Sequence, residues 1–294
     1  MPAQGCVVAH GMPTAAASSA RQTLVRLAPI VVFAACAGSP PLAPAARPNA
    51  GPTISLQENW HAKVLVERDD SIILTLPSGN RQLQQFHRSA AFTLGVAGDG
   101  TVSLRLDSLT MRPPGEGGHA TPLRAVWTGR ADDPRVIAFR VSAGGSFADE
   151  LTAVVRNLLP RFPAGGAHAQ TTWTDSAAGR VRVDIFTAKE RRVATWTAGT
   201  LRHDANGTSL TLQVRENYEQ LGRGSQGGQS MTMTSQGRRS GIYYSTVGGR
   251  LTSAELTDST IMLISLPDTR QVVPTLRFGR ASVRFIPISR DSSE

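Results

Sequence analysis

Hydrophobic residues recur at every second position over most of the chain from about Ile54 onward. In a strand this spacing places them on one face, because successive side chains point to opposite sides. The clearest runs are Ile72, Leu74 and Leu76; Val102, Leu104 and Leu106; Val181, Val183 and Ile185; and Leu210, Leu212 and Val214. Between such runs, Asp99-Gly100 and Asn206-Gly207 are typical of tight hairpin turns, since these residue types tolerate a positive φ. The pattern predicts many short, half-buried antiparallel strands.

One segment, residues 147–159, departs from this period. Helical spacing is shared by five apolar residues ahead of Pro160, namely Leu151, Val154, Val155, Leu158 and Leu159. A Pro- and Gly-containing connector, RFPAGGAHAQ, follows, and a new series of strands begins at Trp173. We therefore expect a mainly β fold. It would consist of two antiparallel β-meander halves, residues 54–160 and 161–294, each a half-barrel or a curved sheet, with one amphipathic helix near 147–159 between them.

The two halves also resemble each other in sequence. The stretch GDGTVSLRLDSLTM from Gly98 aligns with DANGTSLTLQVRENYEQL from Asp204, at an offset of about 107 residues. Further on, RVIAFRVSAGGSFADELT aligns with RRSGIYYSTVGGRLTSAELT, with Gly144-Gly145 over Gly248-Gly249. These matches predict an internal repeat, although similar hairpins would produce part of the match by composition alone.

The N-terminal stretch reads as an export signal. Residues 21–38, RQTLVRLAPIVVFAACAG, contain two arginines, an apolar run of nine residues from Leu27 to Ala35, and small residues around Cys36. This is the order of regions in a secretory signal peptide. A transmembrane helix needs about 20 apolar residues, so this run is too short for one. We predict a signal peptide at residues 1–35, with either Met1 or Met12 as the start.

The residues Phe33-Ala34-Ala35-Cys36 resemble the lipobox of bacterial lipoproteins, in which the cysteine is acylated and becomes the new N-terminus. The resemblance implies that Cys36 is the lipid attachment site and anchors the protein to a membrane. Ordinary cleavage after Ala37 is the alternative. The Pro-rich residues that follow Cys36 would form an extended tether, residues 36–53. The small residue Ala37 resembles that of lipoproteins sent to the outer membrane, so we expect an exported envelope protein, facing the periplasm.

The composition limits which disulfides and binding partners are expected. Only Cys6 and Cys36 occur, both upstream of the predicted body, so a structural disulfide is not expected. The formal charge is +9, and loss of Arg21 and Arg26 with the signal peptide leaves about +7. The basic residues are scattered or occur in pairs, Arg191-Arg192 and Arg238-Arg239. Because aromatic residues do not interleave with them, we predict a solvated basic surface and no nucleic-acid partner.

Three stretches, LTAVVRNLLPRFPAGG, TTWTDS and YYSTVGGRLTSAELT, resemble an uncharacterised family of bacterial lipoproteins that has a β-rich body, a domain of unknown function. The resemblance covers roughly two thirds of the chain. Its motifs are structural, so it implies a compartment and a fold but no active site.

Motifs of catalysis are absent from the sequence. There is no G-x-S-x-G elbow, and Ser146 and Ser240 have no neighbouring base. The aspartate pairs Asp69-Asp70 and Asp132-Asp133 are predicted to lie at hairpin tips. No phosphate-binding loop is present, and the glycines around Gly222-Arg223-Gly224 and Gly227-Gly228 are predicted to form a mobile hairpin connection. Metal-ligand spacing is also missing, since the histidines considered are isolated from one another: His61, His87, His119, His168 and His203. We expect no metal site and no cofactor.

Two hypotheses of function remain. In the first, the protein is a non-enzymatic envelope module that binds a lipid, a hydrophobic ligand or an envelope protein. Adaptable Met and interface-prone Tyr and Trp side chains would then contact the ligand, and the candidates are Trp127, Met231, Met233, Tyr243 and Tyr244. Packing in the core is the alternative role for each. In the second, the protein is a periplasm-facing hydrolase whose site is assembled from loops around His119 or His168.

Overall fold

The computed structural model describes residues 53–112, 125–130, 138–141, 151–152, 154–183, 185–204 and 207–288. The predicted signal peptide, Cys36 and nearly all of the predicted tether lie outside these residues. Among the described residues, none belongs to a helix with the length and apolar character needed to cross a membrane.

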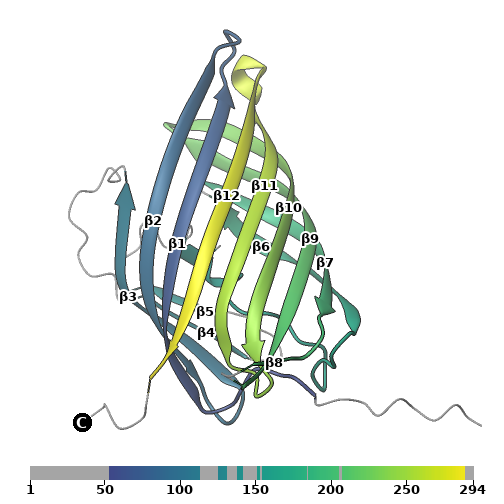
Figure 1. The fold of residues 1–294 in the computed structure, drawn as a ribbon. Coiled ribbons are helices and arrows are strands. Elements are labelled where there is room, and N and C mark those ends of the chain that lie inside the picture. The colour runs from purple at the N-terminus through teal and green to yellow at the C-terminus, as the bar shows by residue number, and fades with distance from the viewer. Residues whose placement is uncertain are drawn as a thin grey trace, which may run out of the picture. The chain divides into compact units, whose positions relative to one another are not determined.

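Strands dominate this part of the chain (Figure 1), which confirms the mainly β fold class. The described strands are β1 (Trp60–Thr75), β2 (Arg81–Val96), β3 (Thr101–Arg112), β4 (Ala125–Arg130), β5 (Ala138–Val141), β6 (Thr172–Val183), β7 (Phe186–Ala198), β8 (Arg202–Asp204), β9 (Gly207–Gln226), β10 (Gln229–Thr246), β11 (Leu251–Leu266) and β12 (Gln271–Pro287). A short 3₁₀ turn, η1 (Pro267–Thr269), links β11 to β12. The strands form one antiparallel sheet in the order β5-β4-β3-β2-β1-β12-β11-β10-β9-β7-β6, with β8 beside β9.

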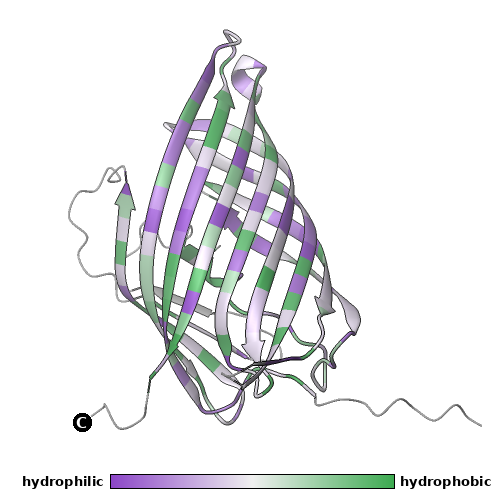
Figure 2. Ribbon diagram, in the orientation of Figure 1, coloured by the Kyte–Doolittle hydropathy of each residue, from purple (hydrophilic) through white to green (hydrophobic). Residues whose placement is uncertain are grey.

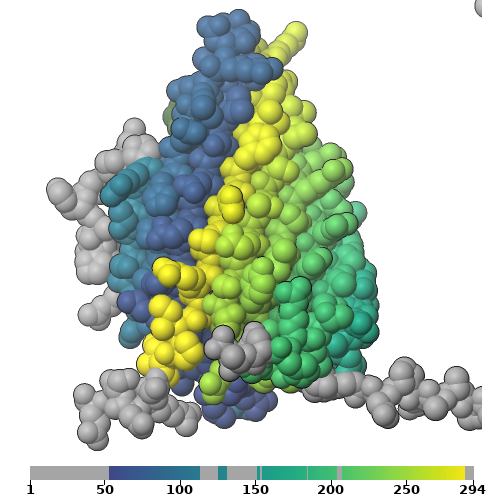
Figure 3. All heavy atoms as spheres, viewed as in Figure 1, coloured from purple at the N-terminus to yellow at the C-terminus, as the bar shows by residue number. Residues whose placement is uncertain are grey.

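The two predicted halves join through β1 and β12. These strands pair antiparallel from Ala62 opposite Pro287 to Leu74 opposite Thr275. In Figure 3 the side chains of β1, near the start of the described chain, lie directly beside those of β12, at its end. The N-terminal and C-terminal strands therefore belong to one continuous curled sheet, and the two predicted halves do not form separate sheets.

Buried and exposed residues alternate along the strands, as the period of two predicts. In β10, for example, buried residues occupy nearly every second position from Met231 to Ser245. We call the buried side of the sheet its inner face. Tight turns connect several strands, and at Gly227-Gly228 both residues have a positive φ, of 58° and 81°. This is the conformation of a type I′ hairpin turn. The glycine-rich connection predicted there is therefore a two-residue turn, and Gly222 and Gly224 lie within β9.

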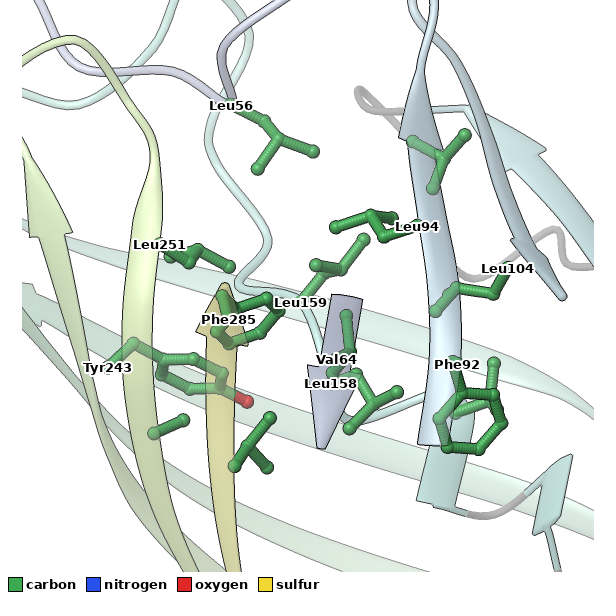
Figure 4. Packing of buried hydrophobic residues seen from close by; sticks show 14 of the residues in the cluster. Leu56, Val64, Phe92, Leu94, Leu104, Leu158, Leu159, Tyr243, Leu251 and Phe285 are labelled. Carbon is green, nitrogen blue, oxygen red and sulfur yellow. The ribbon is translucent and has the colours of Figure 1, made fainter. Parts of the chain in front are cut away.

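The main hydrophobic core lies on the inner face, at the end of the sheet where β1 begins and β12 ends. This is the lower part of the sheet in Figure 1. The segment of residues 151–152 and 154–162, called here the inner segment, packs against this core. Figure 4 shows Leu158 and Leu159 among side chains of the sheet that include Tyr243 and Phe285. All four are buried and belong to one cluster. Burial of this apolar surface is the main stabilising contribution.

The inner segment is helical over a shorter stretch than predicted. Residues 151, 152, 154 and 155 are helical, and the Arg156 N–H donates to the Thr152 carbonyl four residues earlier. The next two bonds, from Asn157 to Val154 and from Leu158 to Val155, span three residues and form a tighter turn. The helix therefore ends before Leu159, although Leu158 and Leu159 are still buried. Residues 147–150 and 153 lie outside the described part of the chain.

Candidate anion-binding site

Charged side chains cross the middle of the inner face, where an apolar core would be expected. Hydropathy varies along the strands in Figure 2, and polar stretches lie between apolar ones. The inner-face charges come from seven strands, and we call them the charged belt: Arg68, Asp70, Arg88, Glu190, Arg192, Glu216, Arg239, Asp258 and Arg277. Strand pairing brings them together, since Asp70, Gly279, Asp258, Arg239 and Glu216 are successive partners across the sheet.

Asp70 is the centre of the first ion-pair cluster and is 2% exposed. Arg68 donates to its two carboxylate oxygens at 2.9 and 2.7 Å, and Arg277 donates to Oδ1 at 3.3 and 3.2 Å. Arg88 also donates to Asp70. Burial by itself would raise the pKa of Asp70, but the hydrogen bond from Arg68 and the charges of Arg277, Arg68 and Arg88 outweigh it and lower that pKa. Asp70 is thus held as a carboxylate.

Glu216 is the centre of the second cluster. Arg161 of the inner segment donates to its Oε2 at 2.6 Å, and Arg239 donates to the same oxygen at 2.8 Å. Arg161 also pairs with Asp175 on β6. Because Arg161, Arg239 and Glu216 are all buried, these interactions are poorly screened by water. The cluster fixes the inner segment against the sheet.

A third cluster surrounds Glu190 on β7. Arg156 of the inner segment donates to its Oε1 at 3.0 Å, and the Gln220 amide donates to Oε2 at 2.8 Å. The Ser235 hydroxyl donates to the Gln220 side-chain oxygen at 3.2 Å. Both carboxylate oxygens of Glu190 are therefore occupied by partners within the protein.

Arg192 differs from the rest of the belt. Arg192 is only 4% exposed, yet its Nε and Nη2 atoms have no hydrogen-bond partner among the described residues. Burial lowers the pKa of Arg192 to about 10, and the charges of Arg161 and Arg156 act in the same direction. The carboxylates of Glu216 and Glu190 attract it electrostatically but are hydrogen-bonded to other donors. Arg192 is thus a buried cation with unused donors.

A cavity of about 150 Å³ adjoins Arg192 and the rest of the belt. Its apolar lining residues include Val154 and Leu158 of the inner segment, and Val181 and Val183 of β6. Its charged lining consists of seven arginines and three carboxylates: Arg68, Arg88, Arg156, Arg182, Arg192, Arg239, Arg277, Glu190, Glu216 and Asp258. Positive charge dominates even when Asp70 is counted with them. The cavity is suited to an anion.

The five ligand-binding candidates from the sequence do not meet at this cavity. Trp127 and Tyr243 are buried in the main core, at 1% and 0% exposure. Met231 and Met233 belong to a smaller apolar cluster, and Tyr244 is exposed on the outer face. None of the five lines the cavity. Of the five, Tyr243 interacts with residues around the cavity. Its hydroxyl donates to the Asn157 carbonyl at 2.7 Å, and the charge of Arg239 acts on its pKa.

The prediction that Asp69-Asp70 forms a hairpin tip is wrong. Both residues lie within β1, where the period of two turns Asp69 outward and Asp70 into the belt. The alternation of Val64, Val66, Ile72 and Leu74 continues in phase through positions 68 and 70, so extending it across the charges would have placed Asp70 inside. Asp132-Asp133 lies outside the described residues.

The prediction of a purely solvated basic surface is also wrong, for the same reason. Each arginine pair spans both faces of a strand, so Arg191 and Arg238 are exposed while Arg192 and Arg239 are buried. A charge that follows another charge on a strand points to the opposite side. One arginine of each pair, Arg192 or Arg239, is therefore part of the belt.

The histidines and serines considered from the sequence do not converge on the cavity. His87 lies on the outer face beside Asp69 and Glu67, and His203 bonds Thr208. The exposed Ser240 hydroxyl bonds Thr257. Within the described ranges, no group of three or more His, Cys, Asp or Glu residues is placed to hold a metal ion. His119 and Ser146 lie outside those ranges.

Comparisons with known proteins do not assign the chain to a family. No protein-family model matches it, and no curated protein matches it. Among solved structures, it is similar to OccK2 (OpdF) of Pseudomonas aeruginosa, with 8% sequence identity and a TM-score of 0.21, over 78% of this chain and 99% of that chain. It is similar also to OccK11 (OpdR) of Pseudomonas aeruginosa, with 8% identity and a TM-score of 0.19, over 80% of this chain and 99% of that chain.

Proposed function

We propose that this protein is a non-enzymatic binding module that takes an anionic group into the cavity beside the charged belt. The observation that carries the proposal is the buried guanidinium of Arg192, whose Nε and Nη2 donors lack partners among the described residues. Burying an unpaired charge costs several kcal/mol, so a retained one indicates a partner that arrives from outside. An anion in the cavity would accept those hydrogen bonds.

The chemistry of the belt favours an oxyanion. A guanidinium presents planar, paired N–H donors that match the oxygens of a carboxylate or a phosphate. Arg156 and Arg239 also line the cavity, and each is already paired with a carboxylate of the protein. They would add positive potential without needing to release their partners. A phosphate or carboxylate group is therefore the ligand class that the site fits best.

The proposal includes a location in the cell envelope. The signal peptide of residues 1–35, the tether of residues 36–53 and acylation of Cys36 would hold the module at the outer membrane, facing the periplasm. Support comes from the order of the apolar run, the small residues and the cysteine. Acylation at Cys36 is tested by labelling cells that express the native protein or Cys36→Ser with radioactive palmitate, with and without globomycin. Label that persists in the variant would exclude Cys36 as the attachment site.

Inorganic phosphate is the probe for the binding site. The whole protein, purified after export, should unfold at a higher temperature in phosphate than in chloride of equal ionic strength, because a ligand that binds only the folded state stabilises it. Arg192→Met should abolish this difference. Arg191→Met is the matched control, since Arg191 is the neighbouring residue on β7 and points outward.

The two variants separate specific binding from general electrostatics. If phosphate stabilises the Arg192→Met protein as much as the native protein, the cavity does not bind the anion and the proposal fails. If Arg191→Met removes the effect as completely as Arg192→Met, the phosphate response is a property of the overall charge, and the proposal fails in that case too.

A further inference from the structure

The cavity adjoins an apolar strip on the inner face, on the side of the sheet towards η1. This is the upper part of the sheet in Figure 1. Three of the residues that line the cavity, Val181, Val183 and Met262, also belong to the smaller apolar cluster. The cluster consists of inner-face residues, which we call the upper strip: Val181, Val183, Ile185, Phe186, Ala188, Met231, Met233, Met262, Ile264 and Leu266. An anionic site and an apolar surface are thus continuous.

The upper strip is less covered than the core below the belt. There, Leu151, Val155, Leu158 and Leu159 of the inner segment pack on the sheet and complete the core. The smaller cluster contains no residue of that segment, and Val181, Val183, Met262 and Ile264 are only partly buried although they lie on the inner face. Apolar side chains in this state still have surface to bury against a ligand.

We propose that the ligand is an anionic lipid, whose phosphate or carboxylate head binds at Arg192 and whose acyl chain lies along the upper strip. This inference rests on the proposed function and names its ligand class. Charge complementarity with the belt fixes the head, and the continuity of cavity and strip fixes the direction of the chain. Methionines such as Met233 and Met262 have flexible side chains that adapt to an acyl chain.

The length of the strip is sufficient for such a chain. Arg192 pairs with Tyr218 on β9, and β9 continues eight residues further to Gln226. At about 3.3 Å per residue this is about 26 Å. The acyl chains of one bilayer leaflet span about 15 Å, which is half of a hydrocarbon core of about 30 Å. A twelve-carbon chain therefore fits between the belt and the end of the sheet.

A series of alkyl phosphates tests the inference on the whole purified protein. Inorganic phosphate, butyl phosphate and dodecyl phosphate share the anion and differ in the chain, and all are used below micelle-forming concentrations. Each buried methylene group raises affinity about fourfold, so dodecyl phosphate should bind at least about 100-fold more tightly than butyl phosphate. Isothermal titration calorimetry measures both.

Two variants assign the head and the chain. Arg192→Met should lose the binding of all three phosphates. Ile264→Asn should weaken dodecyl phosphate about tenfold or more and leave the response to inorganic phosphate unchanged, because Ile264 is a partly exposed residue of the strip that does not line the cavity. Ile261→Asn is the control, since Ile261 is 59% exposed on the outer face of the same strand, β11.

The outcomes distinguish the inference from the proposed function. If all three phosphates bind equally well, or if Ile264→Asn has no effect on dodecyl phosphate, the lipid inference is overturned and anion binding stands. If no phosphate binds, both are overturned. Uncharged dodecyl maltoside is the last control. If it binds as tightly as dodecyl phosphate and Arg192→Met leaves its binding unchanged, the charged head does not contribute to binding and the lipid inference is overturned.

Discussion

Arg68 on β1 forms an ion pair with Asp258 on β11, although the two strands are separated by β12. The Arg68 Nη2 atom donates to both oxygens of Asp258, at 2.7 and 2.8 Å. The side chain crosses β12 above Gly279, where a Cβ atom would overlap with both partners. The missing side chain of Gly279 thus lets the belt connect strands that are not hydrogen-bonded neighbours, and it links the N-terminal strands to the C-terminal ones.

Replacing Gly279 with Ala should therefore separate this ion pair. Because the partly buried charges would lose their pairing, we expect the free energy of unfolding to fall by about 2–4 kcal/mol. Urea denaturation followed by tryptophan fluorescence measures the change. Gly179→Ala is the matched control, since Gly179 also lies in a strand and has open space at its Cβ position. Equal effects of the two substitutions would show that Gly279 has no special role as a crossing point.

Neutralising Glu216 should destabilise the protein strongly. In Glu216→Gln, the buried Arg161 and Arg239 lose the carboxylate that both share, and removing one member of a buried ion cluster costs about 3–5 kcal/mol. The outward-facing Glu219→Gln on the same strand should change stability by less than about 0.5 kcal/mol. Chemical denaturation at neutral pH compares them, and a loss below about 1 kcal/mol in Glu216→Gln would contradict the described cluster.

Replacing Arg192 should leave the ligand-free protein at least as stable as the native one. Its buried charge is not hydrogen-bonded at Nε or Nη2 in the described structure, and an apolar side chain of similar length removes the cost of keeping it there. We expect Arg192→Met to raise the free energy of unfolding by about 0–3 kcal/mol in phosphate-free buffer. A clear loss of stability would mean that Arg192 supports the fold instead of a ligand.

Stability should decline in acid because of Asp70. The pKa of Asp70 is lowered in the folded protein, so its contribution is complete above the ordinary value of 3.8 and is lost as pH falls further. Denaturation curves between pH 6 and pH 3 should show this decline in the native protein and a shallower one in Asp70→Asn. Asp268→Asn in η1 is the control for an exposed aspartate. Parallel curves for the native protein and Asp70→Asn would exclude Asp70 as the source.

Ionisation of Tyr243 should contribute to the loss of stability at alkaline pH. Burial raises its pKa to about 12, so the folded state keeps this proton after the unfolded state has lost it near pH 10. The stability from Tyr243 is complete below pH 10 and is lost between pH 10 and about pH 12. Arg192, with a pKa of about 10, contributes a change of opposite sign, because the folded state releases its proton first.

Tyr243→Phe isolates the tyrosine contribution. The variant should lose about 1 kcal/mol at neutral pH, since the hydroxyl no longer donates to the Asn157 carbonyl. Its stability should then decline less steeply above pH 10 than that of the native protein. Absorbance titration at alkaline pH should also lack the last tyrosine transition. An unchanged last transition would assign it to Tyr218, whose pKa burial also raises.

The strands and the two faces of each strand can be predicted from the sequence alone. The alternation of Val64, Val66, Ile72 and Leu74 is a local property of an extended chain, so it predicted a β fold with a buried side. When the same alternation is extended to position 70, it places Asp70 on the buried side. The apolar residues of the inner segment, such as Leu158, were likewise recognisable as buried.

Which strands pair and which charges converge cannot be predicted locally and depends on the tertiary structure. The pairing of β1 with β12 joins residues about 200 positions apart, and no local period encodes the register between them. That register places Gly279 between Asp70 and Asp258 and thereby creates the crossing point for Arg68. The carboxylates of Glu190 and Glu216 accept hydrogen bonds from the inner segment, β9 and β10. Their oxygens are therefore occupied by donors other than Arg192. A charge on a strand is set inside or outside by local geometry, but whether it finds a partner is decided by the fold.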